Sequence, residues 1–192
     1  MSIKPYVIGI GGGTCSGKTT LVKNVIGLIG SEYTMTALHM DKYYKNPIIR
    51  TIAPITGIEY AEANHPDSLE TDRLFSDFNE AVANEKNDIV IIEGLFSLHY
   101  EQVREKLDLR VFVDLKSDER MYRRIKRWMD RQSVDDIAHR YLDTVRYRHD
   151  EFVEPTRWRA DMIINGTLES NMGTEILITY IREAMKARKI TI

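Results

Sequence analysis

The sequence predicts an α/β protein in which a five-stranded parallel sheet carries helices on both faces. Short apolar runs rich in Val and Ile alternate with longer segments of helical period, a pattern typical of parallel strands joined by crossover helices. Three of the five runs are apolar almost throughout, as expected for central strands that are covered on both sides. The predicted strands comprise residues 6–10, 34–39, 89–92, 109–113 and 162–164.

The first two predicted helices each show a single apolar stripe at helical spacing. The first covers Lys18–Ile29 and the second covers about 71–84. Apolar residues three and four positions apart lie on one side of a helix, so each stripe is expected to pack on the sheet. The stripes consist of Leu21, Val22, Val25 and Ile26 in the first helix and of Leu74, Phe75, Phe78 and Val82 in the second.

Three further helices are predicted in the second half of the chain. One begins after Ser117, and another opens at Ser133, whose spacing to Asp136 resembles a capping box, and ends before Pro155. The last begins at about Thr174 and ends in basic residues that suit the negative end of a helix dipole. Their apolar positions are Met121, Ile125 and Trp128, then Val134, Ile137, Tyr141, Leu142 and Val145, then Ile176, Leu177, Tyr180, Ile181 and Ala184.

Length and charge narrow the class of protein. A chain of 192 residues, 43% of them hydrophobic, suits one domain over residues 1–192 with a substantial core. The 27 basic and 29 acidic residues give a net charge of -2, which argues against broad binding to nucleic acid or to an anionic membrane. The single cysteine, Cys15, excludes an internal disulfide framework and fits a reducing cytosol, so we expect a cytoplasmic protein. The composition permits a homo-oligomer without locating an interface.

A glycine-rich loop follows the first strand and leads directly into the first helix. Residues 12–19 satisfy the pattern of glycine, four residues, glycine, lysine and then serine or threonine. Backbone N–H groups and the positive end of the helix converge here on one anion, for which phosphate is the natural candidate. Lys18 is expected to reach the β and γ phosphate oxygens, and Thr19 to ligate Mg²⁺. The predicted nucleotide-binding residues of the loop are Gly12, Gly13, Thr14, Cys15, Ser16, Gly17, Lys18, Thr19 and Thr20.

Two carboxylates follow predicted strands and are expected at the same edge of the sheet. Asp41 comes after the strand 34–39, and Glu93 comes after the strand 89–92. Ligands of open α/β sheets bind beyond the carboxyl ends of the strands, so both acids should face the phosphate loop. Phosphoryl transfer needs a base for the attacking hydroxyl and a metal that bridges the phosphates. We assign the base to Asp41 and the Mg²⁺ shell to Glu93 and Thr19, although Asp41 and Glu93 could exchange these roles.

Four arginines lie at helical spacing after the fourth strand: Arg120, Arg123, Arg124 and Arg127. Like charges at this spacing repel one another, so the stripe implies an anionic partner. The phosphates of ATP are the candidate partner, because a planar guanidinium can hold phosphate oxygens and stabilise charge on the transferring group. We expect residues 120–135 to form a lid in which Arg123 and Arg127 act in catalysis and Arg124 binds nucleotide. The alternative is a solvated face paired with nearby acidic side chains.

The longest irregular stretch, residues 46–66, is predicted to contribute to the site for a phosphate acceptor. It contains three prolines and a glycine, and loops of this length are usually functional. Within an acceptor loop over about 42–67, Tyr43, Tyr44 and His65 could contact a substrate ring. For each of these side chains, packing in the core or in a turn stays the alternative.

Taken in order, the motifs of this chain resemble those of uridine kinases. The match covers nearly the whole sequence, and the motifs are jointly specific for the wider uridine kinase and phosphoribulokinase superfamily. The resemblance implies a five-stranded P-loop kinase fold with a helical lid, ATP or GTP as donor, Mg²⁺, and phosphorylation of a primary hydroxyl such as the 5′-OH of uridine or cytidine. By position it carries the catalytic aspartate to Asp41 and the lid arginines to Arg123, Arg124 and Arg127. Besides the phosphate loop, the motifs are DKYYK at 41–45, NHPD at 64–67, IIEG at 91–94, VFVD at 111–114, RR at 123–124, FVEPT at 152–156 and ADMII at 160–164.

One departure from the family concerns the acceptor. Uridine kinases typically insert, before the strand that leads to Glu-Gly, a hairpin with a Tyr-Asp-Phe and a nearby His that contact the nucleoside. Here only residues 85–88 separate the helix from that strand, so the resemblance implies kinase chemistry more firmly than pyrimidine recognition. Nicotinamide riboside kinases resemble this chain in lacking the hairpin. Three interpretations stay open: a uridine or cytidine kinase, a kinase of another small acceptor such as nicotinamide riboside or a sugar or polyol, and a nucleotide-sensing protein without catalysis.

Overall fold

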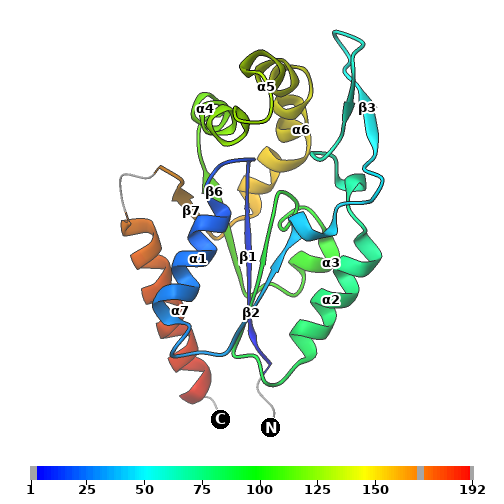
Figure 1. Cartoon of the computed structure of the whole chain (residues 1–192). Coiled ribbons are helices and arrows are strands. Elements are labelled where there is room, and N and C mark those ends of the chain that lie inside the picture. Colours follow the sequence, from blue (N-terminus) through cyan, green and yellow to red (C-terminus); the bar gives the residue numbers. More distant parts are fainter. Residues whose placement is uncertain (1–3, 168–170, 191–192) are drawn as a thin grey trace.

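The central sheet confirms the predicted α/β class. The computed structural model describes residues 4–167 and 171–190, and the remaining residues of the expected domain over 1–192 lie outside the described part. Five parallel strands stand in the spatial order β2-β5-β1-β6-β7 (Figure 1). Each corresponds to a predicted strand, and all except β2 extend one or two residues further at the carboxyl end. The strands are β1 (Tyr6–Gly12), β2 (Met35–His39), β5 (Ile89–Glu93), β6 (Leu109–Asp114) and β7 (Met162–Asn165).

Helices cover both faces of this sheet, as Figure 1 shows. α1 (Lys18–Ile29) and α7 (Met172–Ile190) lie on one face, and α2 (Thr71–Ala83) and α3 (Glu101–Arg104) lie on the other. Side chains alternate across each strand, so β1 and β5 contribute to both apolar cores and are buried along their whole length. This double burial holds the carboxyl ends of the central strands, and the loops that follow them, in fixed positions.

The predicted helices occur with small shifts in their bounds and faces. α1 has the predicted bounds, but Ile29 is buried on its packed face, whereas the predicted Ile26 is 37% exposed. The reason is that positions 22, 25 and 29 continue one stripe along the helix, from which position 26 is rotated away. Among residues 4–167 and 171–190, no helix combines the length and the apolar character needed to cross a lipid bilayer.

A layer of helices lies beyond the carboxyl ends of the strands (Figure 1). α4 (Ser117–Trp128) begins where the sequence predicts, and a second helical run follows it. The hydroxyl of Ser133 accepts a hydrogen bond from the N–H of Asp136 at 3.0 Å, which confirms the predicted cap. The α- and π-helical part of the run ends before Pro155, as predicted. The run consists of α5 (Val134–Arg140), a π-helical turn (Tyr141–Val145), α6 (Arg146–Arg148), a second π-helical turn (His149–Val153) and a 3-10 helix (Glu154–Arg159).

The expectation of an irregular stretch over 46–66 was wrong, because part of it forms an antiparallel hairpin. β3 (Arg50–Ile52) pairs with β4 (Glu59–Ala61), and Gly57, at a φ of 70°, turns the chain between them. Two 3-10 turns, Met40–Tyr43 and Pro66–Ser68, flank the hairpin on either side. A strand of three residues is too short to show alternation, so the sequence holds no periodic signal for it.

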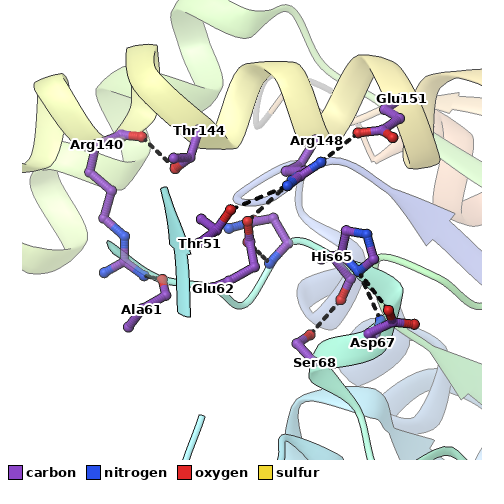
Figure 2. A network of polar contacts seen from close by, with 11 residues as sticks. Thr51, Ala61, Glu62, His65, Asp67, Ser68, Arg140, Thr144, Arg148 and Glu151 are labelled. Carbon is purple, nitrogen blue, oxygen red and sulfur yellow. Dashed lines mark hydrogen bonds and ion pairs between the residues drawn. The ribbon is translucent and has the colours of Figure 1, made fainter. Parts of the chain in front are cut away.

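Polar contacts dock the hairpin on the helical run 134–153, which lies beside it (Figure 2). The guanidinium of Arg148 donates to Glu62 Oε2 at 3.2 Å and to Thr51 Oγ1 at 3.3 Å. Arg140 donates to the carbonyl of Ala61. Further along, the Tyr60 hydroxyl donates to Asp143 at 2.8 Å. The hairpin therefore owes its place to side chains from a distant part of the chain.

Candidate active site

The phosphate loop has a backbone shape that glycine allows. Gly12 ends β1 at a φ of 137°, and a Cβ there would lie 2.4 Å from the carbonyl oxygen of Val113. Gly17 precedes α1 at a φ of 107°. Both angles lie in the region that side chains rarely adopt. Cys15, at a φ of 57°, takes the left-handed conformation inside the loop. The chain thus curls around an anion-sized space at the start of a helix.

Lys18 lies buried beneath this loop. Its Nζ donates to the carbonyl of Gly13 at 2.8 Å, so the side chain folds back along the loop it follows. Burial lowers the pKa of the Lys18 ammonium, while the negative charges of Glu93 and Asp41 oppose that shift. The negative charges of Glu93 and Asp41 therefore favour the charged form of Lys18, at the place where the sequence predicts phosphate oxygens.

Glu93 lies at the end of β5 with oxygen and nitrogen groups around it. Its Oε1 accepts from the Thr19 hydroxyl at 3.0 Å and lies 2.8 Å from His39 Nδ1. A hydroxyl beside a carboxylate is the oxygen set that Mg²⁺ uses when nucleotide phosphates and water complete its shell. The described residues contain no cluster of three or more His, Cys, Asp or Glu side chains that would hold a metal by themselves. Thr19 and Glu93 thus fit the Mg²⁺ assigned to them.

Asp41 lies in the 3-10 turn that follows β2 and lines the same cavity as the phosphate loop and Glu93. Its side chain is exposed, so an incoming hydroxyl can approach it. The Tyr44 phenol lies against it, and burial, followed by the charge of Asp41 and a hydrogen bond to it, raises the pKa of Tyr44. The neutral phenol is a donor that orients the carboxylate.

Two of the four arginines of the predicted stripe contact the phosphate loop. Arg120 is only 4% exposed, and its Nε donates to the carbonyl of Leu115 at 3.0 Å. It packs so closely against Gly13 that a Cβ on that glycine would lie 2.7 Å from its Nη1. Arg124 donates to the Thr14 hydroxyl at 3.4 Å. This face of α4 therefore covers the loop rather than pointing into solvent.

The other two arginines flank the mouth of the loop. Arg123 donates to the carbonyl of Gly166 at 2.9 Å and lies 3.8 Å from Glu119. The guanidinium of Arg127 is 5.0 Å from the centroid of the Trp128 ring, whose ring also lies 4.5 Å from the guanidinium of Arg124. Cation–π contacts of this kind keep a guanidinium in place while its N–H groups stay available for an anion.

A single cavity of about 480 Å³ joins these groups at the carboxyl edge of the sheet. It brings together the loop residues 14–20, the carboxylates Asp41 and Glu93, Tyr44 and three arginines of the predicted stripe. Its size and its position beyond the strand ends suit a nucleotide with a second small substrate. The lining residues are Thr14, Cys15, Ser16, Gly17, Lys18, Thr19, Thr20, Asp41, Tyr44, Ala63, Asn64, Glu93, Leu95, Arg123, Arg124, Arg127, Trp128, Gln132, Ile137 and Arg140.

Some predicted site residues lie away from the cavity lining. Tyr43 is buried among apolar side chains, and its hydroxyl donates to Asp77 of α2 at 2.9 Å. The His65 ring accepts from the N–H of Asp67 at 3.1 Å and packs edge-on against Phe152. Both side chains are therefore held by packing and turn contacts, which was the alternative to a contact with the substrate. Gly12 and Gly13 form the base of the loop behind the lining residues.

Three polar residues of the wall were not among the predicted site residues: Asn64, Gln132 and Arg140. Asn64 was visible only as part of the motif at 64–67, and Gln132 only as part of the predicted lid. Arg140 follows Ile137 by three positions, so the two share a helix face, but that spacing alone does not show that the face lines a cavity. Nothing in the sequence tells that this face of α5 meets the end of the hairpin.

Comparison with known proteins agrees with this arrangement. The model of the phosphoribulokinase / uridine kinase family matches residues 59–172. A uridine kinase from Chlamydia pneumoniae is 31% identical, over 94% of this chain and 90% of the relative, and one from Bacillus pumilus is 30% identical over 98% and 99%. Shikimate kinase from Acinetobacter baumannii shares the fold, with a TM-score of 0.54 and 17% identity over 98% of this chain and 96% of that one. On the family match and on relatives similar along nearly its full length, the chain belongs to the phosphoribulokinase / uridine kinase family.

Proposed function

We propose that this protein transfers the γ-phosphate of ATP to a primary hydroxyl of a nucleoside, with the 5′-OH of uridine or cytidine as the first acceptors. The observation that carries the proposal is the single cavity that Lys18, Thr19, Asp41 and Glu93 line together. A protein that only sensed nucleotide would need the phosphate loop but no carboxylate across from it. The names of the relatives, both uridine kinases, support the choice of acceptor.

In this proposal the phosphate loop and the lid hold the donor. Backbone N–H groups of the loop and the Lys18 ammonium bind the phosphates of ATP, with GTP as the alternative donor, and Arg124 adds a contact over the loop. Arg123 and Arg127 lie at the mouth and stabilise charge on the transferring group. Thr19 and Glu93 would hold a Mg²⁺ ion, which would supply neutralisation of the phosphate charge.

Asp41 acts on the acceptor. The hydroxyl oxygen attacks the γ-phosphorus, the bond from that phosphorus to the β–γ bridging oxygen breaks, and the hydroxyl proton passes to the Asp41 carboxylate. Asp41 suits this role because its side chain is exposed and lines the same cavity as the loop, with the Tyr44 phenol beside it. Glu93 is less suited, since Thr19 and His39 already occupy its Oε1.

A second candidate keeps this chemistry and changes the acceptor to nicotinamide riboside, another nucleoside, or a sugar or polyol. The observation that favours it is the short connection between α2 and β5, which runs only from Asn84 to Asp88. No nucleoside-contacting insertion fits there, and the wall of the cavity comes instead from residues 63 and 64, after the β3–β4 hairpin.

The test is a panel of acceptors with ATP and Mg²⁺: uridine, cytidine, nicotinamide riboside and ribitol. We expect ADP to form with one class of acceptor and the monophosphate to appear by mass spectrometry. Absence of uridine and cytidine turnover eliminates the first acceptor and leaves the second candidate. ATP that binds tightly but is not consumed with any acceptor would contradict the proposed function and favour a nucleotide sensor.

A further inference from the structure

The acceptor end of the cavity contains an arginine that the proposed chemistry does not use. We propose that Arg140 selects an acceptor that carries an anionic group, a carboxylate or a phosphate, in addition to its primary hydroxyl. This inference rests on the proposed phosphotransfer and favours its second candidate, because uridine and cytidine carry no anionic group. Three observations carry it: the anchoring of Arg140, its unpartnered Nε, and the lack of an ion pair between a carboxylate and either Arg140 or the nearby Arg124.

Arg140 is fixed in the wall where the hairpin ends. One of its terminal nitrogens donates to the carbonyl of Ala61, at the end of β4, as Figure 2 shows. Ala63 and Asn64, which follow this carbonyl closely, line the cavity, and so does Arg140 itself. A side chain anchored in this way loses little conformational freedom when a ligand binds, which makes its charge an efficient recognition element.

The anchored guanidinium still has a donor to offer. Its Nε is buried and has no acceptor among the described residues. A buried donor without a partner costs free energy in the folded protein, so the Arg140 guanidinium is not fully satisfied by protein acceptors. Because a guanidinium presents its N–H groups in a planar fork, the matching ligand is a pair of oxygens such as those of a carboxylate or phosphate.

The positive charge at this end is not compensated by the protein. Within residues 4–167 and 171–190, neither Arg124 nor Arg140 forms an ion pair with a carboxylate. Both arginines line the cavity, and burial, followed by the charge of Arg140, lowers the pKa of Arg124, so the two positive charges repel each other there. Two like charges that approach each other in a partly buried wall favour an anion between or beside them.

The carboxylates near Arg140 are already engaged. Glu62 is 2% exposed and pairs with Arg148 at 3.2 Å. Asp143 accepts from the hydroxyls of Thr56 and Tyr60, at 2.9 and 2.8 Å. Asp136 accepts from the Ser133 hydroxyl at 2.7 Å. Asp41, the remaining carboxylate on this side, is assigned to the proton of the acceptor.

The experiment compares acceptors with and without an anionic group, in wild-type protein and in Arg140→Met. Nicotinic acid riboside with nicotinamide riboside tests a carboxylate against an amide on the same ring, and ribitol 5-phosphate with ribitol tests a phosphate. We expect wild-type protein to favour the member with the carboxylate or phosphate in one pair, in kcat/KM, by about 100-fold, mainly through KM. In Arg140→Met this preference should disappear while kcat/KM for the member without that group changes less than about 3-fold, and Arg140→Lys should restore part of the preference.

The matched control is Tyr60→Phe, which removes a contact between the same hairpin and the same helical run without touching the cavity lining. A purely structural role of Arg140 would lower kcat/KM for both members of a pair equally, as we expect of this control, and would overturn the inference. Turnover of uridine with no preference for either anionic acceptor would overturn it as well and leave the proposed function standing. If no acceptor is phosphorylated, calorimetric binding of the same pairs to the protein with a non-hydrolysable ATP analogue decides the inference, because equal affinities would contradict it.

Discussion

The donor end and the acceptor end of the cavity are built in different ways. At the donor end, consecutive residues between β1 and α1 form the loop, and positive φ angles at Gly12 and Gly17 give it its shape. At the acceptor end, two strands of three residues each depend on side chains from the helical run 134–153. The contacts of Arg140 and Arg148 there join residues 79 and 86 positions apart.

Because the two ends are built separately, the phosphotransfer chemistry and the choice of acceptor can change independently. Substitutions in the hairpin or in the facing helix alter the acceptor wall without touching the buried strands that hold the loop. The central strands, in contrast, are buried on both faces, so changes there disturb the whole sheet. The division predicts that variants at the two ends affect different kinetic constants.

The largest effect is expected at the base, where the two ends meet. Asp41→Asn removes the proton acceptor but keeps the size of the side chain, so kcat should fall by about 10³-fold, within the usual range for general-base catalysis. The dissociation constant of ATP should change less than about 2-fold, because the donor contacts remain. Steady-state kinetics measures kcat, and equilibrium titration with ATP measures the dissociation constant. Near-normal turnover would show that another residue is the base, and it would contradict the division between the donor end and the acceptor end.

A smaller effect is expected at the metal site of the donor end. Glu93→Gln keeps an oxygen for Thr19 but removes the negative charge, so activity at limiting Mg²⁺ should fall by about 10- to 100-fold. Excess Mg²⁺ should recover part of the loss, and KM for the acceptor should not change. Mg²⁺ titrations at fixed ATP measure this. An altered acceptor KM with an unchanged Mg²⁺ dependence would instead assign Glu93 to the acceptor end.

The free energy of unfolding is expected to depend on pH through His149, which is affected by charges of the donor end. Burial, and then the charges of Arg120 and Lys18, lowers the pKa of His149 from 6.5 to about 3. Below pH 6.5 the unfolded chain binds a proton at this histidine that the folded chain does not, so the free energy of unfolding decreases as the pH falls toward 3. At pH 5 this contribution is about 2 kcal/mol relative to pH 8.

Urea unfolding of wild-type protein and of His149→Leu at pH 8 and pH 5 tests this. The variant should be less stable at pH 8 because of lost packing, but its stability should decrease less between the two pH values, by about 2 kcal/mol. An equal decrease in both proteins would mean that His149 does not carry this pH dependence. It would also leave no support for an effect of the Arg120 and Lys18 charges on His149.

The smallest effect is expected from the contacts that dock the hairpin. The double variant Glu62→Gln with Arg148→Gln removes the ion pair without leaving a buried charge unpaired. It should raise KM for the acceptor by about 10-fold and leave KM for ATP unchanged, since the loop 12–20 has no contact with this pair. Initial-rate kinetics with each substrate varied in turn measures both constants. A parallel rise in KM for ATP would show that the two ends are coupled.

Much of the fold follows from the sequence because its signals are local. The five strands are short, mainly apolar runs, and the bounds of α1 and the cap at Ser133 agree with residue patterns that act within one turn of helix. The loop 12–19 is recognisable for the same reason, since its conformation depends on its own glycines. Asp41 and Glu93 could be placed near it, because the carboxyl ends of parallel strands meet at one edge.

The acceptor wall could not be derived in this way. The hairpin leaves no periodic trace in six paired residues, and the positions of Tyr43 and His65 depend on what packs against them, Asp77 in one case and Phe152 in the other. The same holds for the arginine stripe. Equal spacing on one helix hides the fact that Arg120 is buried under the loop while Arg127 stays exposed.

The class of fold, the phosphate loop and the pair of carboxylates can be derived from the sequence, because each of these depends on neighbours in the chain or on the polarity of parallel strands. Which residues form the acceptor wall, and that Arg140 lies in it near Arg124, is known only from the packed structure. Contacts between residues about eighty positions apart place the hairpin against the helix. Such contacts depend on the packed chain as a whole, so no local pattern of residues encodes them.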